Sequence, residues 1–136
     1  MPRQLIGHDG ITSATGDHLG YSPTTTIAQQ HLDDFVRAIG MPFPDAAGYF
    51  ALSLSNLFLP QIVDVQGFDM GVNYGCDKVT FDAEIHAGDS VRAGAVLVST
   101  TPVTGGVQTL MLITVEIVHA SGNKTACTIE SLSRWY

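Results

Sequence analysis

The sequence has few basic residues, and this scarcity limits the partners it can have. Six Lys and Arg residues stand against 13 Asp and Glu residues, so the formal net charge of the 136-residue chain is −7. A nucleic-acid-binding surface needs clustered Lys and Arg to neutralise phosphates. We therefore expect no nucleic-acid partner, and the same charge disfavours any polyanionic ligand unless a few cations gather locally.

Cysteine is equally scarce, and the spacings of metal sites are missing. Cys76 and Cys127 lie far apart without a CxxC pattern, which indicates two reduced, buried thiols and neither a disulfide framework nor a zinc site. The five histidines show no HxxxH or HExxH spacing, and GVNYG at 71–75 lacks the Lys-Ser/Thr ending of a phosphate-binding loop. We expect no metal ion and no other cofactor.

Long uninterrupted apolar runs and targeting signals are also absent. Residues 1–18 lack the apolar segment of a secretory signal. The most apolar stretch, residues 46–63, is interrupted by Ser53, Asn56 and Pro60, whereas a bilayer-spanning helix needs about 20 mostly apolar residues. We expect no membrane span and a cytoplasmic location.

Residues 46–63 are instead predicted to form the central helix of the fold. Apolar side chains occur around nearly its whole circumference, which is typical of a helix buried on all sides. A shorter helix is predicted over 29–39, with Gly40 as its C-cap, and a loop over 41–47. Residues 1–20 are predicted to be an irregular leader, followed by a first strand over 21–28.

Everything after the central helix predicts strands. Alternating or β-branched stretches cover residues 69–81, 90–101, 107–119 and 125–135, with a hairpin turn at 104–106. Four or five long antiparallel strands can curl around the helix and bury it. We therefore predict an α+β fold, a single hotdog domain over 1–136 in which a curved antiparallel sheet wraps a long central helix. Because such a sheet has open edges, we also expect a dimer.

Several segments resemble one family in the same order along nearly the whole chain. They are GYFALSLSNLFLP at 48–60, GVNYGCDKVTF at 71–81, AGDSVRAGAVL at 87–97 and ACTIESLSRWY at 126–136. These segments are similar to the MaoC-like hotdog proteins, a group that includes (R)-specific enoyl-thioester hydratases. The resemblance implies an acyl-thioester ligand, carried by coenzyme A or a carrier protein, whose carbonyl binds N–H groups near Gly48.

The resemblance also implies a catalytic segment that this chain lacks. Active members carry an Asp and a His, spaced D-x-x-x-x-H, on a segment between the two helices, and a His-Gly pair before the central helix. Here MPFPDAA at 41–47 contains no His, and only Gly48 matches the pair. Asp82 and Glu84 stand where the family favours prolines. The resemblance therefore implies that the usual Asp/His pair is missing and that any chemistry depends on other groups.

Four residues are candidates for a site. Asp45 is a possible replacement acid or base, and the alternative is a solvated loop residue or a helix cap. Tyr49 could offer its phenol to a ligand or simply pack. Gly48 is the candidate oxyanion position. Asn73 is a candidate substrate contact, with a purely structural role in satisfying backbone groups as the alternative.

Three functions remain open at this point. The first is an enzyme of acyl-thioester or polyketide-like intermediates that dehydrates, isomerises or cyclises its substrate through other pocket groups. The second is a non-catalytic subunit of a heterodimeric MaoC-like dehydratase. The third is a binding protein for a hydrophobic small molecule. The expected assembly is a homodimer or a heterodimer with another MaoC-like chain.

Overall fold

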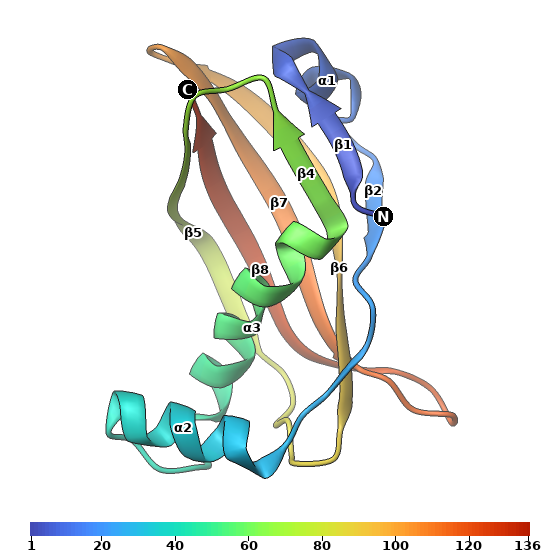
Figure 1. Cartoon of the computed structure of the whole chain (residues 1–136), viewed down its shortest axis with the longest axis vertical. Coiled ribbons are helices and arrows are strands. Elements are labelled where there is room, and N and C mark those ends of the chain that lie inside the picture. Colours follow the sequence, from blue (N-terminus) through green and yellow to red (C-terminus); the bar gives the residue numbers. More distant parts are fainter.

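The computed structural model describes all 136 residues as one long helix lying across a curved sheet (Figure 1). The helices are α1 (Gly7–Ser13), α2 (Gln29–Ile39) and α3 (Ala47–Ile62). The strands are β1 (Arg3–Ile6), β2 (His18–Tyr21), β3 (Thr25–Thr26), β4 (Val63–Gln66), β5 (Gly71–Phe81), β6 (Ser90–Val103), β7 (Gly106–Ile117) and β8 (Lys124–Trp135). This arrangement confirms the predicted α+β class.

The large sheet has the order β2-β6-β7-β8-β5, with β3 also paired to β6. All its pairings are antiparallel. Every second residue of β7, from Val107 to Ile117, is buried, because alternate side chains of a strand point to the face that α3 covers. The strands predicted from alternation are confirmed, and Gly105 takes a φ of 81° in the predicted hairpin turn.

Only one side of α3 is buried. The helix packs its inner face on the sheet through Phe50, Ala51, Leu54, Phe58 and Ile62. Tyr49 and Leu57 are 53% and 45% exposed on the other side. The expectation of a helix buried on all sides is therefore wrong for a single chain, because the sheet covers α3 from one side only. No helix has the length and apolar character to cross a membrane.

The first 20 residues are ordered, so the expectation of an irregular leader is also wrong. β1 pairs in parallel with β4, with Arg3 opposite Val63. α1 buries Ile11, and β2 joins the large sheet beside β6. The strand predicted over 21–28 is interrupted, because in that range only Tyr21, the last residue of β2, and the two residues of β3 pair with β6. The partners of these elements lie far along the chain, which local patterns do not reveal.

The predicted short helix is confirmed with its boundaries. α2 covers Gln29–Ile39, and Gly40 follows with a φ of 70°. The Gly40 N–H donates to the Val36 carbonyl at 2.8 Å. Glycine adopts this left-handed conformation at little steric cost, so it ends the helix and turns the chain toward α3.

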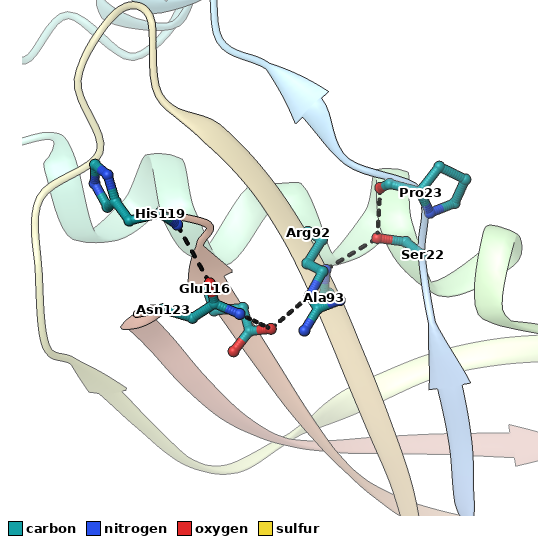
Figure 2. Close-up of polar contacts among 7 residues, drawn as sticks. All are labelled: Ser22, Pro23, Arg92, Ala93, Glu116, His119 and Asn123. Atoms are coloured by element: carbon teal, nitrogen blue, oxygen red, sulfur yellow. Dashed lines mark hydrogen bonds and ion pairs between the residues drawn. The ribbon is translucent and has the colours of Figure 1, made fainter. Parts of the chain in front are cut away.

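Polar contacts fix the N-terminal part of the chain to the sheet (Figure 2). The Ser22 N–H donates to the Ala93 carbonyl at 2.8 Å, and the Ser22 Oγ accepts from the Ala93 N–H at 2.9 Å. On the neighbouring residue, the Arg92 Nε donates to Glu116 Oε1 at 2.6 Å, across paired strands. The Ser22 contacts hold the segment between β2 and β3 in place against β6, and the Arg92–Glu116 contact joins β6 to β7.

The burial pattern of α3 predicts unequal costs of truncation. Phe58 is fully buried, so Phe58→Ala should lower the free energy of unfolding by about 3–5 kcal/mol. Leu57→Ala, at the adjacent but half-exposed position, should cost about 1 kcal/mol or less. Urea unfolding followed by circular dichroism measures both values, and equal losses would contradict this orientation of the helix.

Candidate functional site at the start of the central helix

The first turn of α3 leaves two backbone donors without acceptors. Ala46 and Ala47 donate their N–H groups to carbonyls of the preceding loop at 3.0 Å, and Phe50 donates to the Ala46 carbonyl at 2.9 Å. The N–H groups of Gly48 and Tyr49 have no acceptor within the protein, and no side chain caps this helix end. Such free donors at a helix N-terminus favour an oxygen that carries negative charge.

These two residues line a cavity of about 320 Å³ between the start of α3 and the end of β5. The structure therefore brings three of the four predicted site residues together, namely Asp45, Gly48 and Tyr49. The complete lining consists of Pro44, Asp45, Ala47, Gly48, Tyr49, Phe81, Asp82, Ala83 and Glu84.

Phe81, the last residue of β5, was not among the predicted site residues but shapes this cavity. Its ring lies so close to Gly48 that a Cβ added at position 48 would be 2.6 Å from the Phe81 Cγ. The same ring meets Tyr49 edge to face, with the ring centroids 5.8 Å apart. A side chain larger than hydrogen at position 48 therefore requires Phe81 to move.

The charged groups that line the cavity are all acidic. Asp45 comes from the loop before α3, while Asp82 and Glu84 come from the segment after β5. The Glu84 Oε1 lies 3.8 Å from the Nε2 of His86. The sequence marked Asp82 and Glu84 only as departures from the family pattern. Their proximity to Asp45 depends on the packing of β5 beside α3, so no local signal could reveal it.

No metal or thiol chemistry is indicated at this site. Nowhere does the chain bring three or more His, Cys, Asp or Glu side chains into an arrangement that could hold a metal ion. Burial, and secondarily the nearby charge of Asp82, raise the pKa of the Cys127 thiol to about 11, so it stays protonated at neutral pH. Cys127 is buried as expected, but Cys76 is exposed, so that part of the expectation is wrong.

Asn73 lies away from the other candidates. It is exposed on β5 and lines a second hollow of about 360 Å³. β5 runs back alongside α3, so Phe81 at its end contacts Gly48 at the start of the helix. Asn73 lies near the beginning of β5 and lines this second hollow together with Leu59 and Pro60 from the last turns of α3. The structure does not bring Asn73 to the free N–H groups.

Comparison with known proteins identifies relatives over nearly the whole length. The 3-hydroxyacyl-thioester dehydratase Z of Mycobacterium tuberculosis is 31% identical over 142 aligned positions, which cover 92% of this chain and 93% of that protein. The protein of the same name in Mycobacterium bovis gives the same values. The chain belongs to the MaoC-like hydratase family. No family model matches the sequence.

Solved structures show that this MaoC-like chain has the hotdog fold, as predicted. The monoamine oxidase regulatory protein of Archaeoglobus fulgidus superimposes with a TM-score of 0.73 and 17% identity, covering 99% of this chain and 96% of that one. The R-hydratase PhaJ1 of Pseudomonas aeruginosa gives a TM-score of 0.65 and 16% identity, covering 89% and 81%. At these identities the likeness concerns the fold alone.

The contact of Phe81 with Gly48 predicts a coupled effect of mutations. Gly48→Ala should lower the free energy of unfolding by about 1–3 kcal/mol, because the new methyl group overlaps the Phe81 ring. In a Phe81→Ala background the same change should be neutral or stabilising by up to about 1 kcal/mol, since alanine is the better helix former. Urea unfolding of the four variants tests this, and additive effects would exclude the contact.

Proposed function

We propose that this MaoC-like chain is an enzyme of acyl thioesters that works through an enolate held at the start of α3. The observation that carries the proposal is the pair of free N–H groups, on Gly48 and Tyr49, lining a cavity that also contains the Asp45 carboxylate. The substrate class follows the 31%-identical relative, which is a 3-hydroxyacyl-thioester dehydratase.

The two N–H groups suit the oxygen of a thioester. When a proton leaves the carbon next to a thioester carbonyl, negative charge moves onto the carbonyl oxygen. Backbone donors fixed in place before the reaction stabilise that charge without reorganising, and one such donor typically contributes 10²–10³-fold in rate. In this proposal the thioester carbonyl accepts from Gly48 and Tyr49.

Asp45 is the proposed group for proton transfer. It lines the same cavity, directly before α3, and a positioned carboxylate can take a proton from the α-carbon and return it. We propose that the Asp/His pair implied by the family resemblance is lost, since the connection between α2 and α3 contains no histidine. Addition of water needs a base for the water and an acid for carbon, so it should be slow, whereas enolisation, isomerisation or cyclisation needs only one such base.

The remainder of the substrate is proposed to extend along α3 toward the second hollow. The second hollow, with Asn73 and Leu59, lies about 16 Å from Gly48 along the helix axis, at 1.5 Å per residue. This direction suits an extended or polyketide-like acyl chain and gives Asn73 a substrate contact far from the chemistry. No Lys or Arg lines either hollow, so the phosphates of the carrier would lie outside both.

The exposed strand β5 favours a second candidate, a subunit of a dimer. β5 forms one edge of the large sheet, is 11 residues long and contains no buried residue. A long exposed edge presents unpaired N–H and C=O groups with which another strand can pair. We therefore propose a homodimer, or a heterodimer in which this chain binds the substrate and another MaoC-like chain supplies the catalytic pair. A stable homodimer that catalyses α-proton exchange by itself would exclude the heterodimer.

Hydration of crotonyl-CoA tests the proposal that the Asp/His pair is lost. We expect a rate close to the uncatalysed background, because an oriented acid or base typically contributes 10²–10⁴-fold each. Absorbance of the conjugated thioester measures the rate, with the same assay on 3-hydroxybutyryl-CoA for the reverse reaction. Robust turnover in either direction would show that another pair of residues replaces the missing one.

Asp45→Asn tests the proposed base. Exchange of the α-protons of butyryl-CoA in deuterated buffer, followed by NMR, should fall about 10²–10⁴-fold while the fold, seen by circular dichroism, stays intact. Glu84→Gln is the matched control, since it removes another carboxylate of the same cavity, and should keep the rate within about tenfold. The opposite ranking would assign the proton transfer to Glu84.

A further inference from the structure

A separate cavity lies on the other flank of α3, between α3 and α2. It measures about 370 Å³, and its lining consists of Thr25, Ile27, His31, Asp34, Phe35, Phe50, Leu54 and Leu57, none of which lines the first cavity. The base of this cavity is formed by residues of the hydrophobic core, since Ile27, Phe50 and Leu54 are at most 9% exposed.

Most of the side chains that line the recess are apolar. Phe35 from α2 and Phe50 from α3 meet edge to face, with their ring centroids 5.4 Å apart. Leu54 from the buried face of α3 and Leu57 from its exposed side also line the recess, and Leu57 is 45% exposed. Pockets for small molecules are typically concave and mostly apolar, with a few polar groups that orient the ligand.

His31 provides one such polar group in a fixed state. The backbone N–H of Ala28 donates to His31 Nδ1 at 3.0 Å, which caps the start of α2. A nitrogen that accepts a hydrogen bond carries no proton, so the neutral imidazole holds its proton on Nε2. The His31 Nε2 has no partner in the protein, which leaves an N–H donor on the wall of the recess.

Asp34, one helical turn further along the same face of α2, provides an acceptor. Its Oδ1 accepts from Gln30 at 2.6 Å and from Arg37 at 3.4 Å. No donor reaches its Oδ2. His31 and Asp34 are both exposed, with the Asp34 side chain 56% exposed, so they form the solvent-facing rim of the recess. This rim combines a donor and an acceptor that have no protein partner with an apolar interior, and such a pairing suits a hydroxyl group.

We propose that this recess binds an uncharged apolar alcohol. The hydroxyl oxygen accepts from His31 Nε2, its hydrogen is donated to Asp34 Oδ2, and the hydrocarbon part lies against Phe35, Phe50 and Leu54. An apolar cavity of about 150 Å³ already holds benzene, so this recess has room for roughly ten to fifteen non-hydrogen atoms. The carboxylate of Asp34 and the net charge of −7 disfavour fatty acids. The site is independent of the proposed enolate chemistry.

Titration of the full-length ¹⁵N-labelled protein with 1-octanol tests the site by NMR. We expect saturable chemical-shift changes around Phe35, Phe50 and Leu57, and none at Gly48. Octanoate, with the same chain and a negative charge, should bind at least about tenfold more weakly. Equal binding of octanoate, or shifts centred on Gly48, would overturn the proposal.

Three variants distinguish binding through the hydroxyl contact from nonspecific apolar binding. His31→Glu keeps an acceptor for the Ala28 N–H but removes the Nε2 donor, and should weaken octanol binding about threefold to tenfold. Asp33→Asn changes the neighbouring carboxylate outside the recess and should leave the affinity unchanged. Leu57→Trp, at the half-exposed opening, should abolish binding.

The competing occupant is a second copy of the chain seated on the same surface. Sedimentation of the wild type and of Leu57→Trp distinguishes the two. Octanol binding that Leu57→Trp abolishes at constant oligomeric state supports the proposal. A dimer that dissociates in Leu57→Trp, together with no octanol shifts in the wild type, would assign the recess to an interface and overturn it.

Discussion

The packing of one face of α3 on the concave side of the sheet is the interaction on which the rest of this structure depends. Phe50, Leu54, Phe58 and Ile62 recur at helical spacing and are buried against strands whose inward residues are almost all aliphatic. This contact sets the direction of the helix. It also places the first turn of α3 beside the end of β5, so the position of the free N–H groups at Gly48 and Tyr49 is a product of core packing.

The cavity at the start of α3 has no Lys or Arg side chain beside its acidic ones. Four of the basic side chains are already engaged elsewhere: Arg3 with Asp17, Arg37 with Asp34, Arg92 with Glu116, and Arg134 above the Tyr74 ring. The only charged side chains that line the cavity at the start of α3 are carboxylates. Under the proposed function, the helix N-terminus is the main positive element of this cavity, and the part of the substrate that binds there is uncharged until negative charge develops during the reaction.

Much of the fold was predictable because burial on one face leaves a periodic trace. β7 alternates along its whole length and β6 over its first half, and α2 has both the helical spacing of Leu32 and Phe35 and a C-terminal glycine. The leader was missed because β1 and β4 are short and find their partners at long range. The exposure of Tyr49 and Leu57 could not be predicted from the sequence. An apolar side chain indicates that burial would be favourable, but it does not indicate whether other parts of the same chain cover it.

The site was predictable only in part, for a related reason. Asp45, Gly48 and Tyr49 are neighbours in sequence, so placing the helix start also placed them. Phe81 and Glu84 arrive from another element, and Asn73 is carried to the far end of α3 by the direction of β5. The residue types indicate the chemistry that each side chain can perform. Which of these side chains lie close together depends on the order and direction of the strands, which the sequence alone does not reveal.

The parallel pairing of β1 with β4 has a consequence for how the chain acquires its structure. The first strand has no partner until Val63–Gln66 has been synthesised, and β2 must wait longer, until β6 has followed. The N-terminal third therefore cannot fold by itself as it leaves the ribosome. Its native contacts join distant parts of the chain, and a topology of this kind is associated with slow folding.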